Sequence, residues 1–317
     1  MTTLTTPLLD CVVTDAAQVA DGVIQLTLQA VINRPLPAWR PGAHIDLLLP
    51  IGVQRHYSLC GDPADRRRWR IAVLRHPGGR GGSDYIHAAL RPGAELSVRG
   101  PRNRFALEPA GDYKFVAGGI GITPLLPMVR HLAQADCSSW SMIYGGRSRR
   151  SMAFTEELNA LGGRVAFCPA DEGGRPDLDA YLAGTAPGTL VYCCGPEPLM
   201  AAVRDRCAAL GVGFRCERFA PAAEDEKLNQ PFTVTLGQTG DRVRVPADLT
   251  TLQALRKAGA VVLSSCEEGM CGTCETPVLA GAVDHRDSIL TAEERAANDL
   301  MYVCVSRAHG DALVLDL

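Results

Sequence analysis

The chain has 317 residues and a formal net charge of −3, with 46% hydrophobic and 21% charged residues. Its length suits two or three domains, and its composition is that of a globular protein with substantial cores. This net charge, with 32 Lys and Arg that are scattered along the chain, argues against nucleic-acid binding as the main function. We find no secretory signal and no window of the ~18 apolar residues that a membrane span needs. We therefore expect a soluble, cytoplasmic protein.

Residues 1–109 have the pattern of short β-strands. Along 22–29, Ile24, Leu26 and Leu28 alternate with other residues, and the segments 44–49 and 69–74 are similar short runs. Proline and glycine pairs such as Pro41-Gly42 punctuate these runs. Short strands between frequent turn signals predict an antiparallel β-barrel domain.

Residues 110–222 change to an alternation of strands and helices. The predicted strands and helices, in chain order, are 114–118 (strand), 124–135 (helix), 140–144 (strand), 154–161 (helix), 165–168 (strand), 178–182 (helix), 190–194 (strand) and 196–210 (helix). Strands and helices that alternate at this interval predict an α/β domain built on a parallel sheet.

Residues 223–230 are polar and aperiodic, which predicts a linker, and residues 231–317 form a third unit. This unit opens with two predicted strands at 232–236 and 242–245, followed by a helix near 252–258. We predict that it is a separate domain.

The cysteines divide into two groups. Eight of the twelve are dispersed, several of them in apolar runs, and most of these are expected to be buried thiols. The other four follow the pattern C-x4-C-x2-C, then 29 residues, then C, which is the plant-type [2Fe–2S] spacing; they are Cys266, Cys271, Cys274 and Cys304. Gly269 and Gly272 suit a tight loop because glycine permits positive φ. The alternatives are buried thiols or a zinc site, although zinc knuckles favour paired C-x2-C units.

Residues 231–317 resemble a plant-type ferredoxin, from the opening hairpin to the fourth cysteine in Tyr302-Val-Cys-Val. The resemblance implies a β-grasp fold whose four cysteines hold the cluster.

A second motif lies in the β segment, at Arg55-His56-Tyr57-Ser58. Chemically, Arg55 could bind a phosphate, Tyr57 could offer a flat face to a ring, and the Ser58 hydroxyl could reach the reactive N5 edge of a flavin. The run Gly79-Arg80-Gly81-Gly82-Ser83 precedes a helical stretch, and glycines before a helix N-terminus can form an anion site. An ordinary strand and a glycine-rich turn are the alternatives.

Together these motifs resemble the ferredoxin reductase superfamily, in which R-x-Y-S and a later G-x-x-S hold the flavin. The resemblance implies eleven flavin-binding residues, of which the 72–74 segment would act through backbone atoms: Arg55, His56, Tyr57, Ser58, Ala72, Val73, Leu74, Arg80, Gly81, Gly82 and Ser83. The Gly-Arg-Gly-Gly-Ser form and the domain order resemble the phthalate dioxygenase reductase branch, which uses FMN, whereas benzoate-type reductases begin with the ferredoxin and use FAD. We predict FMN.

A third motif, Gly118-Gly119-Ile120-Gly121-Ile122-Thr123-Pro124, falls between a predicted strand and helix. It is not G-x-G-x-x-G, but its glycine turn can still present backbone N–H groups to a pyrophosphate. We expect Gly119, Gly121, Thr123 and Pro124 to bind the coenzyme, with Pro124 at the first helical position.

The same resemblance extends to Cys194-Gly195-Pro196 after the fourth strand, and it implies that Cys194 lies near the nicotinamide C4. Cys193 is interpreted as a buried thiol. The resemblance also implies that Phe219, in Glu217-Arg218-Phe219, covers the flavin ring until the nicotinamide displaces it, with simple core packing as the alternative. Ser58, Cys194 and Phe219 are thus the candidate catalytic residues.

The coenzyme is expected to be NADH, with NADPH left open. The segment after the second strand of the α/β domain contains no acid, and Arg147 or Arg149 could accept a 2′-phosphate. Relatives in the phthalate dioxygenase reductase branch mostly use NADH, however, and we follow that resemblance.

The resemblance to phthalate dioxygenase reductase, which extends to vanillate O-demethylase reductases, covers nearly the whole chain. It implies an NADH-dependent reductase, expected to be monomeric, that passes electrons through FMN and [2Fe–2S] to a Rieske-type non-heme iron oxygenase. Alternatives are an electron donor to a cytochrome P450 and a flavin and iron–sulfur redox sensor without steady turnover. Glu267, Glu268 and Glu275 could face a basic patch on the partner or form an ordinary solvated surface.

Overall fold

The computed structural model describes residues 8–79, 81–135, 139–162, 164–219, 229–264 and 266–317. The chain separates into two compact units, residues 1–217 and 218–317. Among the described residues, no helix is both long and apolar enough to cross a membrane.

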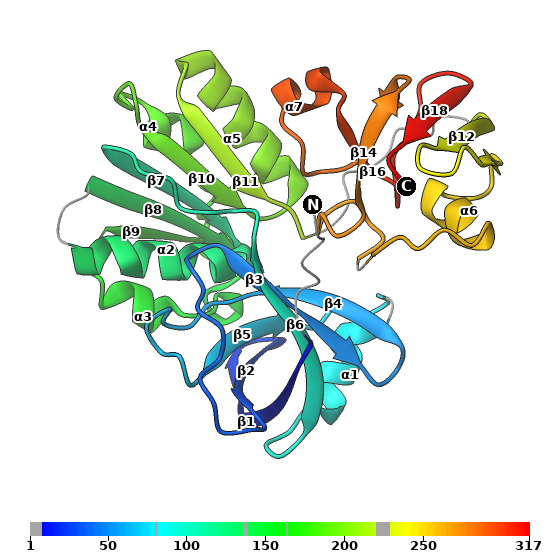
Figure 1. Ribbon diagram of the computed structural model, residues 1–317. Helices are drawn as coiled ribbons and strands as arrows, with labels where there is room; N and C mark the ends of the chain where they lie inside the picture. The colour runs from blue at the N-terminus through cyan, green and yellow to red at the C-terminus, as the bar shows by residue number, and fades with distance from the viewer. Residues whose placement is uncertain (1–7, 80, 136–138, 163, 220–228, 265) are drawn as a thin grey trace. The chain divides into compact units, whose positions relative to one another are not determined.

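The first unit begins with a six-stranded antiparallel sheet that curls into a half-barrel (Figure 1). Its strands lie in the order β4-β3-β6-β1-β2-β5, and their bounds are β1 (Leu8–Ala20), β2 (Val23–Ala30), β3 (Ala43–Leu49), β4 (Val53–Ser58), β5 (Trp69–Leu74) and β6 (Glu95–Asn103). The two outer strands, β4 and β5, contact each other without a hydrogen-bonded ladder between them. Leu26 and Leu28 are fully buried in the barrel core, and Ile24 packs against it, as their alternation predicts.

The second part of this unit is a five-stranded parallel sheet in the order β11-β10-β7-β8-β9. Its strands are β7 (Asp112–Gly118), β8 (Ser139–Gly146), β9 (Val165–Pro169), β10 (Leu190–Cys194) and β11 (Gly213–Glu217). The chain proceeds outward from β7 through β8 to β9 and then returns to the other side of β7. The strand order therefore reverses between β7 and β10, which is where open α/β sheets bind ligands, beyond the carboxyl ends of the strands.

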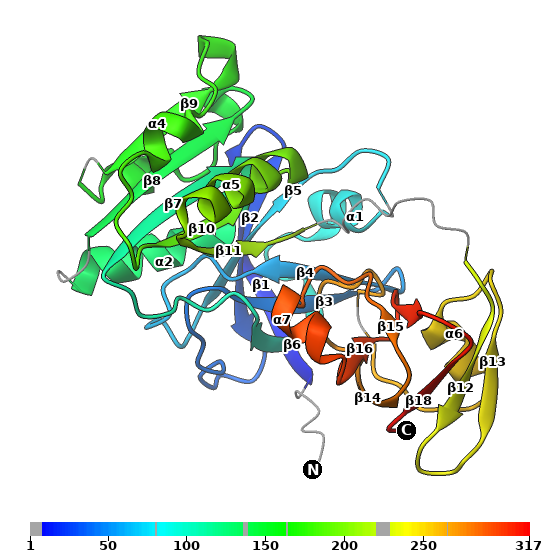
Figure 2. The same cartoon turned by 90° about the horizontal axis from the view of Figure 1, so that it is seen from above.

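Helices cover both faces of the parallel sheet. In Figures 1 and 2, α2 (Ile122–Ala135) and α3 (Thr155–Asn159) lie on one face, and α4 (Leu178–Leu182) and α5 (Glu197–Leu210) lie on the other. The two resulting cores draw on alternate residues of each strand, because successive side chains of a strand point to opposite faces. The α2 core also contains Val23, Cys60 and Ala72 from the half-barrel, so the two parts share a packed interface.

Three local details differ from the sequence-based expectations. The helix expected to start at Pro124 starts at Ile122, so Pro124 is its third residue rather than its first. A proline is tolerated there because the first helical N–H groups have no intrahelical partner. The helix expected at 154–161 spans only Thr155–Asn159. Strand β11 was not predicted, because its sequence Gly-Phe-Arg-Cys-Glu has no clear apolar run.

The division between the first two predicted domains, at 109/110, stays a prediction. It falls between β6 and β7.

The second unit is a small mixed sheet in the order β13-β12-β18-β14-β16 with a separate two-stranded ladder, β15-β17. Its elements are β12 (Phe232–Leu236), β13 (Arg242–Val245), α6 (Thr251–Lys257), β14 (Glu275–Ala280), β15 (Val283–Asp284), α7 (Ala292–Ala297), β16 (Leu300–Tyr302), β17 (Arg307–Ala308) and β18 (Ala312–Leu315). Helix α6 begins with a capping box between Thr250 and Gln253 and buries Leu252 and Leu255 against the sheet. An opening hairpin paired in parallel with the last strand is the β-grasp arrangement expected for this domain.

Candidate functional site

Two glycine-containing loops meet at the carboxyl ends of β7 and β10. A Cβ atom on Gly121 would lie 2.1 Å from the backbone oxygen of Cys194, and one on Gly195 would lie 2.9 Å from the Cα atom of Gly118. Only glycine fits such backbone contacts. The two motifs, which are more than 70 residues apart in the sequence, therefore form one surface at the strand-order reversal.

The first of these loops can hold an anion. Gly119 has a φ of +55°, and Gly119–Gly121 form a single 3-10 turn that leads into the N-terminus of α2. Thr123 is buried and donates a hydrogen bond of 3.0 Å to the carbonyl of Ile120. The N–H groups at the start of a 14-residue helix, placed after a glycine turn, match the needs of a pyrophosphate.

The adjacent cysteines Cys193 and Cys194 point to opposite faces of the sheet. Cys193 lies in the core beneath α5, whereas Cys194 lies on the α2 side. This arrangement agrees with the interpretation of Cys193 as a buried thiol. Burial, together with the charge of Glu217 and the thiols of Cys193 and Cys216, raises the pKa of Cys194 well above its usual value. Cys194 is therefore a neutral thiol near pH 7.

Arg147 is exposed and directly follows β8, where the adenosine half of a dinucleotide could lie. Its neighbour Arg149 pairs with both carboxylate oxygens of Glu172, at 3.1 and 3.0 Å. The backbone N–H of Asp171 donates to the carbonyl of Arg147 at 3.1 Å. Although the segment after β8 contains no acid, folding thus brings two acids beside it.

The flavin motif occupies the outer strand β4. The side chain of Arg55 crosses the start of helix α1 (Gly82–Ala89), since a Cβ atom on Gly82 would lie 2.8 Å from both Cγ and Nε of Arg55. Gly81, with a φ of +77°, is the residue before this helix. A cation and a helix N-terminus, at Arg55 and Gly82, are thus placed together although they are 27 residues apart, as a phosphate site requires.

Other predicted flavin residues lie on the two strands that face each other, β4 and β5. Burial raises the pKa of Tyr57 on β4. On β5, Ala72 and Val73 are buried and Leu74 is half-buried. The Ser83 hydroxyl accepts a hydrogen bond of 3.1 Å from the backbone N–H of His76. Arg80 lies outside the described residues.

His56 points into a polar network rather than toward Arg55. Its Nδ1 lies 2.5 Å from Asp46, a fully buried carboxylate that also accepts from Gln54 and pairs with Arg102. Burial alone would raise the pKa of Asp46, but the hydrogen bond and charge of His56, with Arg102 and His44, lower it. His44, Asp46 and His56 are close enough to ligate a metal. Because the Arg102 guanidinium already pairs with Asp46, an internal ion network is favoured over a metal site.

Glu217 is a candidate site residue that the sequence reasoning overlooked. The Ser58 hydroxyl donates a hydrogen bond of 3.1 Å to its Oε2, and Glu217 pairs in register with Cys194 between β11 and β10. Burial raises the pKa of Glu217 to about 7, although the Ser58 hydrogen bond and the charge of His56 oppose this shift. The end of the flavin strand therefore meets the carboxyl end of the parallel sheet at Ser58, Glu217 and Cys194. Phe219, two residues later, is 44% exposed and belongs to the second unit.

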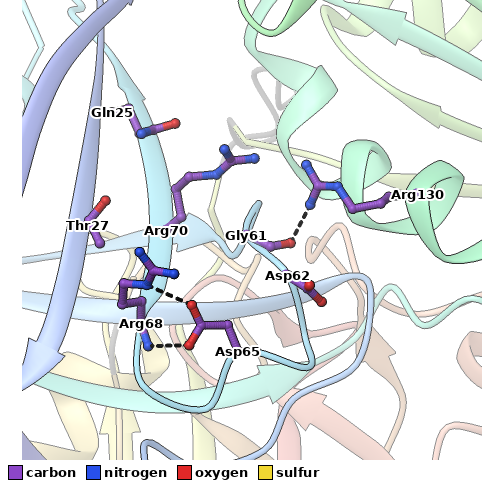
Figure 3. A pocket seen from close by; sticks show the side chains of 8 residues that line it. All are labelled: Gln25, Thr27, Gly61, Asp62, Asp65, Arg68, Arg70 and Arg130. Carbon is purple, nitrogen blue, oxygen red and sulfur yellow. Dashed lines mark hydrogen bonds and ion pairs between the residues drawn. The ribbon is translucent and has the colours of Figure 1, made fainter. Parts of the chain in front are cut away.

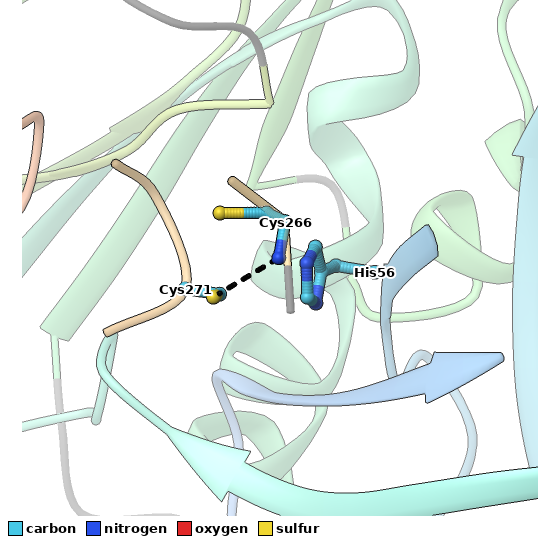
Figure 4. Close-up of side chains that lie close together, drawn as sticks. All are labelled: His56, Cys266 and Cys271. Carbon is cyan, nitrogen blue, oxygen red and sulfur yellow. Dashed lines mark hydrogen bonds between the residues drawn. The ribbon is translucent and has the colours of Figure 1, made fainter. Parts of the chain in front are cut away.

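In the second unit, the side chains of the four spaced cysteines are all buried. The N–H of Cys266 points to Cys271 Sγ at 3.5 Å (Figure 4), and the N–H of Glu268 donates to Cys266 Sγ at 3.2 Å. The thiol of Cys304 interacts with those of Cys266 and Cys274. Converging thiols that receive backbone N–H groups suit an iron–sulfur cluster.

The loop that carries three of these cysteines has the expected glycine geometry. Gly269 and Gly272 have φ values of +67° and +73°. A Cβ atom on Gly269 would lie 2.6 Å from Val305 Cγ2. Of the acids expected near this loop, Glu267 pairs with Arg256 at 2.8 Å and Glu275 accepts from the Tyr302 hydroxyl at 3.1 Å. Glu267 and Glu275 thus each have a partner within the second unit.

Two domain families match parts of the chain. The 2Fe-2S iron-sulfur cluster binding domain family matches residues 234–309, and the oxidoreductase NAD-binding domain family matches residues 115–167. Phenoxybenzoate dioxygenase subunit beta from Ectopseudomonas oleovorans is 43% identical over 300 residues, which cover 94% of each chain. Phthalate dioxygenase reductase, a modular structure for electron transfer from pyridine nucleotides to [2Fe-2S], aligns with a TM-score of 0.72 and 36% identity over 98% of both chains.

The chain belongs to the phthalate dioxygenase reductase family. It is accordingly an NAD(P)H-dependent flavin and iron–sulfur reductase of oxygenase systems, with a half-barrel flavin domain, a parallel-sheet nicotinamide domain and a ferredoxin domain. The chain is also similar to part of an intact type IV self-sufficient cytochrome P450 monooxygenase, with a TM-score of 0.90 and 46% identity. The match covers 98% of this chain and 41% of that one.

Proposed function

We propose that this protein is the reductase component of a Rieske-type non-heme iron oxygenase and transfers electrons from NADH through FMN and [2Fe–2S] to that oxygenase. One observation supports the order of the first steps. Ser58, at the end of the flavin strand, is hydrogen-bonded to Glu217, which is paired with Cys194 at the nicotinamide edge of the parallel sheet. A hydride donor bound at that edge would face a flavin held by β4.

The flavin, when bound, can accept a hydride and release its electrons one at a time, which lets a two-electron donor serve a one-electron cluster. Arg55 and the N-terminus of α1 would hold its phosphate, Tyr57 would stack on the ring, and the Ser58 hydroxyl would lie at its reactive edge. The backbone of residues 72–74 would line the opposite strand. Phe219 would cover the ring when the coenzyme is absent. In the second unit, Cys266, Cys271, Cys274 and Cys304 would ligate the cluster.

We propose that the flavin is FMN and not FAD because of the form of the phosphate site. Arg55 and the α1 N-terminus, with Gly81 immediately before the helix, lie close together and would hold one phosphate. Acid release of the flavin followed by chromatography tests this directly. FMN alone supports the proposal, and FAD would overturn it.

NADH is proposed as the coenzyme because acids lie beside the end of β8. Asp171 is held there by its backbone hydrogen bond to Arg147, and a carboxylate beside the ribose favours a 2′-OH over a 2′-phosphate. Arg149, which could have bound a 2′-phosphate, is paired with Glu172. The kcat/KM values for the two coenzymes decide the matter, and a value for NADPH above that for NADH would refute the assignment.

A second acceptor deserves a parallel test, because the chain is 46% identical to part of a self-sufficient cytochrome P450 monooxygenase. The purified protein would be mixed with NADH and, separately, with Rieske oxygenase components and with P450 haem domains. Faster electron delivery to a Rieske component supports the proposal. Delivery only to a haem domain would favour the P450 alternative, and no steady turnover with any acceptor, cytochrome c included, would indicate a redox sensor.

A further inference from the structure

One carboxylate joins the half-barrel to the parallel-sheet part of the first unit. Glu157 on α3 accepts two hydrogen bonds from Arg70 on β5, at 2.8 and 2.9 Å, and one from Arg130 on α2, at 2.6 Å. The Arg70 and Arg130 side chains are only 22% and 17% exposed, and Glu157 is 38% exposed. Bidentate, partly buried pairs of this kind fix geometry better than exposed ones.

Both arginines also bind the backbone just beyond the flavin strand β4. Arg70 donates to the carbonyl of Cys60 at 2.8 Å, and Arg130 donates to the carbonyl of Gly61 at 2.7 Å. Figure 3 shows Arg130 reaching from its helix to Gly61. Cys60 lies two residues after Ser58, so the two arginines tie the segment that follows β4 to both β5 and α2.

The helix that carries Glu157 begins at an unusual residue. Phe154, which precedes α3, has a φ of +64°, a conformation that is uncommon for a bulky side chain. Its buried ring lies under the Arg70 guanidinium, 5.1 Å from centroid to Cζ. Such strain persists only where the surroundings enforce it. The Arg70 contact therefore stabilises the start of the helix that presents Glu157.

A cavity of about 310 Å³ borders these residues (Figure 3). It is lined by polar groups, namely Gln25, Thr27, Gly61, Asp62, Asp65, Arg68, Arg70 and Arg130. Its charges already have protein partners, since Arg68 pairs with Asp65 and the other two arginines pair with Glu157. On this side of the interface, these ion pairs add to the apolar packing of Val23, Cys60 and Ala72 against the α2 core.

We propose that Arg70, Arg130 and Glu157 form an interdomain clamp that positions the hydride donor against the flavin, an inference that rests on the proposed NADH-to-flavin transfer. Helix α2 begins at the pyrophosphate loop, whereas β4 and β5 carry Ser58 and the segment 72–74. The clamp joins these three elements. Its residues are positioning residues because they act through the elements that hold the reactants and not through contact with them. Hydride transfer is sensitive to such positioning, and a displacement of ~1 Å can cost about 100-fold in rate.

The test compares Glu157→Gln with Asp179→Asn in the flavin- and cluster-loaded protein. Asp179 is a matched control, since it also accepts two hydrogen bonds from one arginine, Arg206, at 2.6 and 3.0 Å, but within the parallel-sheet part. At saturating NADH, stopped-flow measurement should show flavin reduction slowed about tenfold or more in Glu157→Gln, with a larger primary deuterium isotope effect. Flavin content should stay unchanged, and Asp179→Asn should match the wild type.

A second readout does not depend on turnover. In the flavin-free protein, hydrogen–deuterium exchange at residues 59–62 should be faster in Glu157→Gln than in the wild type or in Asp179→Asn. A third variant, Arg130→Met, should slow flavin reduction similarly. The double variant Glu157→Gln/Arg130→Met should be no slower than the slower single variant, because either substitution alone already disrupts the clamp.

Different results would overturn the proposed function and the interdomain clamp. Wild-type protein that binds flavin but is not reduced by NADH would overturn the proposed function itself. A normal wild type, with Glu157→Gln and Arg130→Met reduced as fast as Asp179→Asn, would overturn only the clamp. Additive losses in the double variant would also contradict it.

Discussion

The hydroxyl of Ser58 and the carboxylate of Glu217 are hydrogen-bonded at 3.1 Å across 159 positions of sequence. Ser58 ends the outer strand of the half-barrel, and Glu217 ends the outer strand of the parallel sheet. Cys194 is the in-register neighbour of Glu217. We propose that the flavin and nicotinamide sites meet at this contact.

Changing Ser58 to Ala should slow flavin reduction by NADH about tenfold to 100-fold, because a positioned donor at the reactive edge is lost. Flavin binding should persist, since Arg55 and α1 remain. Stopped-flow absorbance under anaerobic conditions measures the rate. Ser97→Ala, which removes an exposed hydroxyl bonded to Asp10 in the same half-barrel, is the matched control. An equal effect in both variants would argue against a role for Ser58.

Glu217 should make the stability of the flavin-free protein depend on pH. The folded protein retains the Glu217 proton up to about pH 7, whereas the unfolded chain releases it near 4.5, so the free energy of unfolding falls as pH rises through this window. The loss is about 3 kcal/mol at most. Urea denaturation between pH 4.5 and 8 should show a smaller decline for Glu217→Gln than for the wild type. Parallel curves would contradict the raised pKa.

Changing Gly121 to Ala should disrupt the coenzyme site. The new Cβ atom would lie 2.1 Å from the Cys194 backbone oxygen, so the two loops must separate. Overpacking of this kind costs about 1–3 kcal/mol of stability. We expect the Kd for NADH to rise at least about tenfold, which equals ~1.4 kcal/mol. Gly111→Ala meets no atom within 4 Å and should behave like the wild type. Unchanged coenzyme affinity in Gly121→Ala would place the pyrophosphate elsewhere.

Changing Arg55 to Gln should weaken FMN binding by roughly 10- to 100-fold, the worth of a charge-assisted hydrogen bond to phosphate of about 1.5–3 kcal/mol. The affinity for riboflavin, which lacks the phosphate, should change little. Fluorescence titration of the flavin-free protein measures both. Arg68→Gln, which breaks an exposed pair with Asp65 in the same half-barrel, is the control. An equal loss of riboflavin affinity would indicate a disturbed fold and not a phosphate contact.

Changing Cys304 to Ser should abolish electron delivery to external acceptors while leaving NADH-to-flavin reduction largely intact. The cysteine is one of the four converging thiols, whereas the flavin and nicotinamide groups lie in the other unit. Iron content and the EPR signal of the reduced cluster should both fall. Cys207→Ser, on the buried face of α5, should retain the cluster. If Cys304→Ser still reduced a one-electron acceptor at the wild-type rate, the cluster would not be the exit for electrons.

Local patterns predicted several elements to the residue. The strands Trp69–Leu74 and Phe232–Leu236 and the helix Leu178–Leu182 have the predicted bounds, since clear periodicity and flanking turns mark each of them. Strand β11 was missed because an outer strand with mixed residues carries little periodic signal. The glycine motifs and the cysteine spacing could be recognised in the sequence for a similar reason, because each motif is contained in a short segment of the chain.

Contacts between distant segments could not be predicted in this way. The hydrogen bond between Ser58 and Glu217 depends on how the half-barrel packs on the parallel sheet, and so do the ion pairs of Glu157 with Arg70 and Arg130. No local pattern distinguishes these acids from other charged residues of the chain. The acids near β8 were missed for the same reason, because Asp171 and Glu172 follow the neighbouring strand β9.

The central claim is that one chain passes electrons from NADH through a flavin to a [2Fe–2S] cluster. Anaerobic titration with NADH, followed by visible absorbance and EPR, tests it most directly. The account predicts bleaching of the flavin band and the appearance of a reduced-cluster EPR signal in the same titration. A preparation that contains iron but no flavin, or a cluster that stays oxidised after the flavin is fully reduced, would contradict it.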